Sequence, residues 1–230
     1  MIRFMGRREY GQGCSLACAL DRVGERWSML IVRELSLGPL RFSELARSVG
    51  GAPTDVLTAR LRSLAGDGIV RRRELDRPAS VTVYELTELG RGLEAPMLEL
   101  GRWGMALQTA EEVAGLAATS LPNGVRTLLH PPAEAELTLG LRSEGQAYIL
   151  RVKDGWIEAS RGVDPAAEIT LSGSPIGVLA ALVLDEEAEA GVEIEGDRAR
   201  LEELRAMVEL PERLREEARE LVGAGLSTSG

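Results

Sequence analysis

The sequence predicts an α+β protein of two domains. Apolar side chains recur at helical spacing through residues 15–65, and two β-rich stretches follow at 69–75 and 81–86, the first of them basic. Beyond about residue 124 the pattern changes to that of several short strands. The 230-residue chain is long enough for two ordinary cores. We expect domains at 1–116 and 117–230, joined at Ser120–Gly124, which is rich in turn-forming residues.

Charge divides the chain in the same way. Residues 1–108 hold 16 Arg and 13 acidic residues, a net charge of +3, whereas residues 109–230 hold 11 Lys and Arg and 23 acidic residues, a net of -12. DNA binding depends on a local basic face, so the total of -9 does not exclude it. We expect the acidic half to face away from DNA.

Helices are expected at 15–23, at 25–37, from Phe42 with Ser43 as N-cap, and at 54–65 with Thr54 as cap. The stretches 69–75 and 81–86 are read as strands joined by a wing at 76–80, and a long helix follows from 88 to about 114. This order is that of a winged helix-turn-helix, in which one helix enters the major groove of DNA.

The helix at 54–65 is the candidate recognition helix. Leu57, Leu61 and Leu64 form its inward stripe, and the opposite face, with Arg60 at its edge, is free to contact DNA. The candidate contacts on this helix and in the wing are Thr54, Asp55, Thr58, Arg60, Arg62, Arg71, Arg72, Arg73 and Arg77. Asp55 would repel phosphate and could accept a hydrogen bond only from a base such as cytosine. The alternative for these arginines is a solvated helix face.

In the second half, strands are expected at 125–130, 135–142, 146–153, 156–161 and 167–172, with Asp154-Gly155 as a hairpin turn. Ser174-Pro175 begins a helix to about 184. A strand at 192–195 and helices at 197–208 and 211–222 complete this half, before a tail at 223–230.

Residues 14–107 resemble the HxlR family of bacterial winged-helix regulators. The resemblance lies in Cys14–Asp21, Gly24-x-x-Trp27, Ile31–Leu35, Gly38–Leu45, Leu57–Leu61, Asp67-Gly68 and Tyr84–Leu93 taken in order. It implies a homodimer that binds a two-fold-related double-stranded DNA operator and represses or activates transcription. The long helix would then form the dimer seam, because its apolar stripe needs a partner. The candidate seam residues are Leu93, Met97, Leu100, Trp103 and Leu107.

Cys14 coincides with the cysteine that begins the family motif and that senses oxidants or electrophiles in some members. A helix N-terminus lowers a thiol pKa, as such sensing requires, and Cys14 precedes the first helix. The alternative is an inert cysteine. Cys18, one turn later, is expected to be buried, and a cross-subunit bond suits Cys14 better than a strained Cys14–Cys18 bridge.

Residues from about 120 to 222 resemble the sterol-carrier-protein-like domain. The resemblance lies in Tyr148–Ile157, Ala167–Leu171, Gly191–Asp197 and Leu201-x-x-Leu204. It implies a mixed sheet covered by helices, with an apolar tunnel for a small hydrophobic effector. The residues that would line it are Leu171, Ile176, Leu179, Leu182 and Val183. The same residues serve equally well as a plain core, which would make the domain a spacer.

Enzyme chemistry has little support. His130, the only histidine, precedes two prolines, and the sequence has neither metal-ligand spacing nor a phosphate loop, so we expect no cofactor. The N-terminus lacks an apolar signal core and no apolar run is long enough to cross a membrane, so a cytoplasmic location is expected. The alternatives to a transcription regulator are a hydrophobic-ligand carrier whose winged helix only dimerises, and a protein-interaction module.

Overall fold

The computed structural model describes residues 9–75, 81–184, 191–210, 213–216 and 218–220. The chain forms two compact units, Met1–Met97 and Leu98–Gly230. This division lies upstream of the expected boundary at 116/117, because residues after 97 pack within the second unit. Leu98 is buried, and the Arg102 side chain donates to the carbonyl oxygen of Thr127 at 3.2 Å. The expected contact residue Arg77 lies outside the described residues. Of the helix expected at 211–222, residues 211–212, 217 and 221–222 also lie outside them, whereas the described residues 213–216 and 218–220 are helical.

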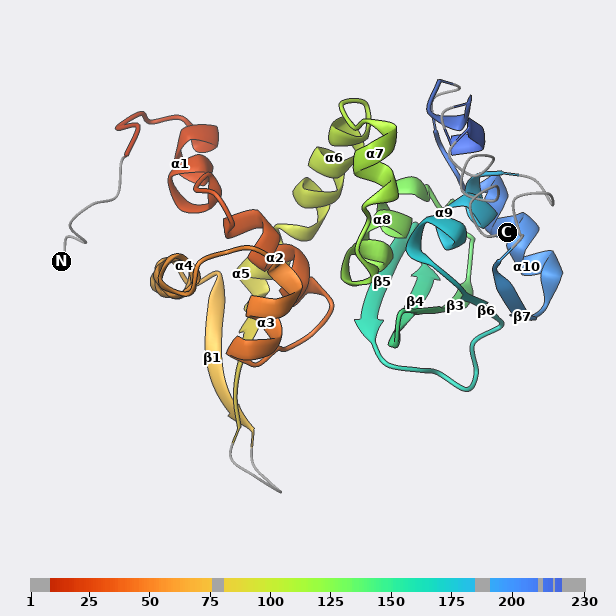
Figure 1. Ribbon diagram of the computed structural model, residues 1–230. Helices are drawn as coiled ribbons and strands as arrows, with labels where there is room; N and C mark the ends of the chain where they lie inside the picture. The colour runs from red at the N-terminus through yellow and green to blue at the C-terminus, as the bar shows by residue number, and fades with distance from the viewer. Residues whose placement is uncertain (1–8, 76–80, 185–190, 211–212, 217, 221–230) are drawn as a thin grey trace. The chain divides into compact units, whose positions relative to one another are not determined.

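The first unit is a winged helix-turn-helix, as the sequence predicts (Figure 1). Four helices precede a two-stranded antiparallel hairpin, and a short helix follows it. They are α1 (Ser15–Val23), α2 (Ser28–Ser36), α3 (Phe42–Val49), α4 (Thr54–Gly66), β1 (Val70–Leu75), β2 (Val81–Leu86) and α5 (Glu88–Arg91). Ile31, Leu45 and the predicted stripe of Leu57, Leu61 and Leu64 meet in its core, each at most 2% exposed.

The first residue of α2 and the N-caps of α3 and α4 differ from those that the sequence predicts. Trp27 has a left-handed φ of 80°, so α2 begins at Ser28 and not at 25. The cap of α3 is Arg41, whose N–H donates to the Glu44 carboxylate at 2.7 Å, so the expected cap at Ser43 was wrong. The cap of α4 is Pro53 and not Thr54.

The long helix expected at 88–114 is three helices: α5, α6 (Glu94–Met105) and α7 (Ala110–Ala114). Pro96 explains the first break, because in a continuous helix it could not donate to the carbonyl of Gly92 and its ring would clash there. At the second break Thr109 begins α7 with a capping box, in which its hydroxyl accepts from the Glu112 N–H.

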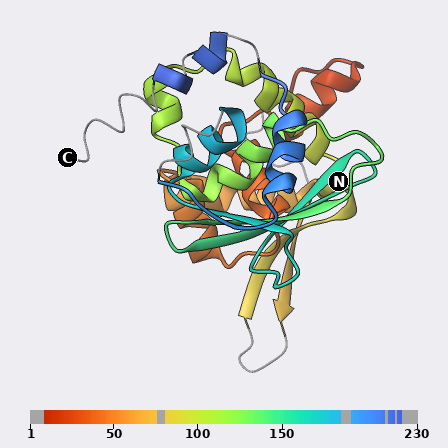
Figure 2. The same cartoon turned by 90° about the vertical axis from the view of Figure 1, so that its right-hand side faces the viewer.

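The second unit is built on a five-stranded mixed sheet in the order β5-β4-β3-β6-β7. Only the β3–β6 pair is parallel. Its strands are β3 (Leu137–Ser143), β4 (Gln146–Lys153), β5 (Trp156–Arg161), β6 (Ile169–Ser172) and β7 (Glu193–Gly196). Besides most of α6, its longer described helices are α8 (Leu121–Leu128), α9 (Pro175–Val183) and α10 (Arg198–Ala206), with a 3-10 turn at Ala118–Ser120. Figure 2 shows α9 and α10 on the same side of the sheet.

Two expectations for this unit were wrong. The residues expected as a linker at 120–124 and as a strand at 125–130 instead form the 3-10 turn and α8, with Leu121 and Val125 fully buried. Pro122 lies in the first turn of α8, where a missing N–H does no harm, and Leu121, Val125 and Leu128 recur at helical spacing on the buried face. The hairpin turn at Asp154-Gly155 is confirmed, with both residues at positive φ.

The proposed tunnel residues divide by exposure. Leu171, Leu182 and Val183 are buried, whereas Ile176 and Leu179 are half-buried. Across the part of the chain that the structure describes, no helix combines the length and the apolar character needed to cross a membrane.

Candidate nucleic-acid interface

The outward face of α4 carries most of the expected helix contacts. Thr54, Asp55 and Arg62 are exposed on it. Thr58 is half-buried, and its hydroxyl donates to the Thr54 carbonyl oxygen at 2.7 Å, which leaves its oxygen lone pairs to accept from a ligand. This face can therefore offer one cation, one carboxylate and two hydroxyl groups to a groove.

Arg60 lies apart from these residues. Its side chain is 26% exposed, and its Nη1 lies 3.7 Å from the Glu25 carboxylate, before α2. In the structure Arg60 joins α4 to the start of α2 and contributes less to the outward face than Arg62 does.

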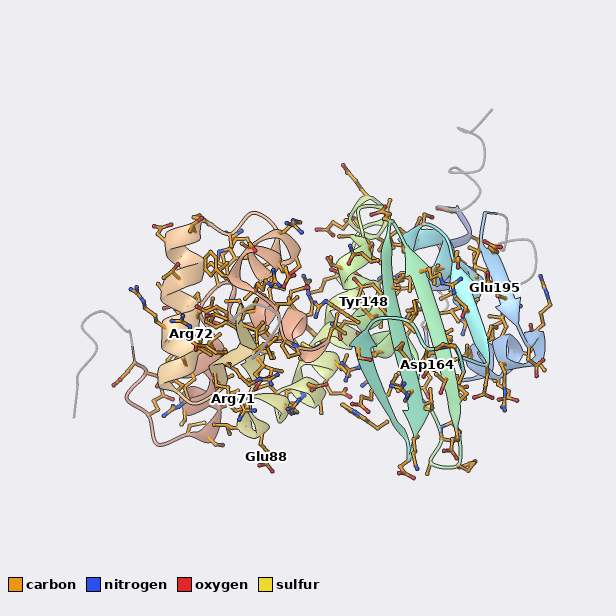
Figure 3. All side chains as sticks on the ribbon, turned by 90° about the horizontal axis from the view of Figure 1, so that it is seen from below. Arg71, Arg72, Glu88, Tyr148, Asp164 and Glu195 are labelled. Carbon is orange, nitrogen blue, oxygen red and sulfur yellow. The ribbon has the colours of Figure 1, made fainter. Side chains whose placement is uncertain are left out.

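The hairpin of β1 and β2, which we call the wing together with residues 76–80, separates its three described arginines. Arg71 and Arg73 share one face with Glu85, and Arg72 lies on the other, where its Nη2 is 3.1 Å from the Thr82 hydroxyl. Figure 3 labels Arg71 and Arg72 as they leave the hairpin. The wing therefore presents cations on both of its faces.

Glu85 is a candidate site residue that the sequence analysis did not single out. Its carboxylate accepts from Arg71 Nε at 2.6 Å and from Arg73 Nε at 3.0 Å. Burial alone would raise the pKa of Glu85, but the hydrogen bonds and charges of the two arginines outweigh it and hold this pKa below its usual range. A signal existed in the sequence, because pairing 69–75 with 81–86 across the wing places Glu85 opposite Arg71.

The two thiols lie at the start of α1. Cys14 is its exposed N-cap, and backbone N–H groups of Ala17 and Leu16 lower the pKa of its thiol. The expectation that Cys18 is buried was wrong, because α1 buries only Ala17 and leaves Cys18 on an exposed side. The guanidinium of Arg22 lies 2.9 Å from the Cys18 sulfur.

The expected dimer residues fall into two groups. Leu93 and Met97 are half-buried against the core of the first unit. Leu100, Trp103 and Leu107 are 54%, 65% and 63% exposed. Of the five, the last three therefore offer the most apolar surface to another chain.

Metal chemistry finds no support in the described part of the chain, where no three or more His, Cys, Asp or Glu side chains gather closely enough to hold an ion. His130 instead has its Nδ1 3.8 Å from the carboxylate of Glu209.

Comparison with known proteins connects this geometry to a family. Residues 22–112 match the family described as HxlR-like helix-turn-helix. The chain is 42% identical over 93 residues to the HTH-type transcriptional regulator Rv3095 of Mycobacterium tuberculosis (strain ATCC 25618 / H37Rv), a match that covers 40% of this chain and 58% of that protein. It thus spans little more than half the length of that relative.

Shorter relatives are covered more fully. The chain is 34% identical over 93 residues to the HTH-type transcriptional regulator YybR of Bacillus subtilis (strain 168), a match that covers 40% of this chain and 74% of that protein. Among solved structures, the redox regulator HypR in its oxidised form is 32% identical with a TM-score of 0.39, over 42% of this chain and 99% of that one. On the strength of the sequence matches, the chain belongs to the HxlR-like helix-turn-helix family.

Proposed function

We propose that this protein is a transcription regulator that binds a double-stranded DNA operator through α4 and the wing. The observation that carries the proposal is the outward face of α4, with Thr54, Asp55 and Arg62 exposed beside an arginine-bearing hairpin. The family membership supports it, since the relatives are named as HTH-type transcriptional regulators.

In the proposed complex α4, a helix of 13 residues, lies in the major groove. Arg62 reads base edges there, and Asp55 accepts from a base donor. The wing arginines, Arg77 included, contact phosphates or the minor groove and hold the protein in register. A homodimer formed through Leu100, Trp103 and Leu107 would present two such helices to a two-fold-related operator.

We propose that the second unit regulates DNA binding by the first. Its mixed sheet, with α9 and α10 on one side, supports the helix-covered mixed sheet that the sterol-carrier-like resemblance implies. A small hydrophobic effector would lie between the sheet and α9, near Leu171, Ile176 and Leu179. To regulate, it must bind the DNA-competent and DNA-incompetent states with different affinity. Oxidation of Cys14, whose thiol pKa is lowered, is a second proposed input.

The test is binding of fluorescently labelled duplex DNA from the region upstream of the protein's own gene, measured by anisotropy at several salt concentrations. The proposal expects tight binding that weakens steeply with salt, because phosphate contacts release counterions. If the protein binds neither this DNA nor random duplex, the regulator proposal is wrong. Uptake of an apolar fluorophore by such a preparation would then favour a hydrophobic-ligand carrier.

A further inference from the structure

Glu85 and the two arginines that it holds are the feature of the wing that the DNA-binding proposal does not yet use. We propose that Glu85 is a positioning residue that fixes Arg71 and Arg73 as a two-pronged clamp for successive phosphates of one DNA strand. This inference rests on the proposed function, since it names how the wing engages DNA.

The contacts to Glu85 use one edge of each guanidinium. Arg71 binds through Nε alone, at 2.6 Å, and Arg73 binds through Nε at 3.0 Å and Nη2 at 2.9 Å. A guanidinium is planar and rigid, so an arginine held at its Nε edge presents its remaining donors away from the carboxylate. The two side chains are 60% and 46% exposed, so these donors can reach a second anion.

The spacing of the two arginines suits a DNA backbone. They are two residues apart on one strand and lie on the same face, so their Cα atoms lie about 6.6 Å apart along the strand, and their Nε atoms bind different oxygens of the Glu85 carboxylate. Successive phosphates on one DNA strand lie at a comparable separation. Each guanidinium can therefore meet its own phosphate, and bidentate geometry suits both contacts.

Glu85 is built into the hairpin, whereas the arginines are not. Its side chain is 9% exposed, and Val83, its neighbour on the same face, is buried. A buried carboxylate that holds two exposed arginines removes much of the rotamer freedom that these long side chains would otherwise lose on binding DNA. Arg71, Arg73 and Glu85 together still carry one net positive charge.

If Glu85 positions the two arginines, removing its carboxylate should weaken DNA binding despite the extra positive charge. If only charge matters, the same change should tighten DNA binding, because it removes a repulsion between the carboxylate and the phosphates. The sign of the effect of Glu85→Gln on DNA affinity therefore separates the two.

The experiment measures anisotropy with the upstream duplex and with random duplex, at several salt concentrations, for the full chain. Glu85→Gln should weaken binding to both duplexes by about threefold or more. The matched control is Glu74→Gln, which removes the same charge from an exposed position on β1, and it should leave affinity unchanged or slightly raised. Circular dichroism melts check that both variants keep the fold.

Two further variants keep the test decisive if Glu85→Gln is unstable. Arg71→Lys/Arg73→Lys keeps every charge but loses both Nε contacts, and it should show the same loss of affinity. Arg71→Ala/Arg73→Ala should reduce the slope of log affinity against log salt by about 1.8, the value for two lost phosphate contacts.

The outcomes separate the clamp from the function on which it rests. If wild type binds DNA but Glu85→Gln binds more tightly, or the double lysine variant binds like wild type, the clamp is wrong and the regulator proposal stands. An unchanged salt slope in the double alanine variant would likewise remove these arginines from the DNA contact. If wild type itself does not bind DNA, the regulator proposal fails first.

Discussion

Arg60 and Arg62 are two residues apart on α4 but have different environments. Arg62 is exposed on the outward face, whereas the Arg60 guanidinium lies near Glu25. A helical wheel places Arg60 at the edge of the polar face, but it cannot show that the Glu25 carboxylate lies 3.7 Å from its guanidinium. We therefore expect base readout from Arg62 and a structural role for Arg60.

Arg62→Ala should weaken binding to the specific operator by about 1–3 kcal/mol and relax base preference, because a side chain that reads a base edge is lost. Anisotropy with specific and random duplexes measures both effects. The matched control is Arg60→Ala, which should leave the ratio of the two affinities unchanged. Equal losses on both duplexes for Arg62→Ala would instead place Arg62 on a phosphate.

Cys14 offers a prediction with a definite sign in pH. Backbone N–H groups of Ala17 and Leu16 lower its thiol pKa in the folded chain, so the reactive thiolate persists to lower pH than it does in the unfolded chain. In a Cys18→Ser background, the rate of iodoacetamide alkylation should therefore rise at a lower pH in native protein than in urea. Coincident pH profiles would show that the helix start does not activate Cys14.

Cys14 is also the residue that connects chemistry to regulation in the proposed function. Treating reduced protein with hydrogen peroxide should change its DNA affinity, and the Cys14→Ser variant should not respond. The Cys18→Ser variant is the matched control for oxidation at the neighbouring thiol. A response shared by wild type and Cys14→Ser would remove Cys14 as the sensor.

At the scale of elements, the junction of α5 with β1 depends on a close approach of two backbones. A Cβ added at Gly90 would lie 2.1 Å from the Ile69 carbonyl oxygen, which accepts the Thr87 N–H. The Gly90 N–H is held by the Thr87 hydroxyl at 3.1 Å. A shift of the segment that relieved this contact would strain these two hydrogen bonds.

Gly90→Ala should destabilise the first unit by about 1–3 kcal/mol through this overpacking. The control is Gly66→Ala in α4, where an added Cβ meets nothing within 4 Å and should stabilise by up to about 1 kcal/mol. Urea unfolding followed by circular dichroism compares the two midpoints with that of wild type. A Gly90→Ala midpoint equal to the wild-type one would show that the junction can relax.

Periodic elements could be predicted from the sequence, and their junctions could not. The stripe of Leu57, Leu61 and Leu64 placed α4 correctly, because burial imposes the helical period. The residue types at 69–75 and 81–86 placed the paired strands β1 and β2 correctly. The linker predicted at Ser120–Gly124 was wrong, since proline and glycine also occur in the first turn of a buried helix such as α8. Glu85 was missed because its role appears only when the strands are paired in register.

At the scale of the whole molecule, the chain combines a mildly basic and a strongly acidic part. The division into compact units at 97/98 assigns most of α6 to the second unit, together with the exposed residues Leu100, Trp103 and Leu107. Helix α6 therefore begins in the proposed DNA-binding unit and continues into the second unit. A dimer formed along this helix would involve both parts of each chain.

Leu100→Glu should break this proposed homodimer. Leu100 is 54% exposed, and the exposed residues Trp103 and Leu107 follow it in the sequence. Association through these three residues would bury the Leu100 side chain, and a carboxylate there would be desolvated without a partner. Multi-angle light scattering should show a dimer for wild type and a monomer for the variant. The monomer should also bind a two-fold operator far more weakly than the dimer, while a single half-site is bound nearly as well, because the second contact is no longer linked to the first.

The matched control is Val163→Glu, which places the same charge on an apolar residue that is 65% exposed elsewhere in the second unit, and it should remain dimeric. A stable dimer in Leu100→Glu would move the interface away from α6, and the exposed Leu16 and Leu20 of α1 would be the next surface to test.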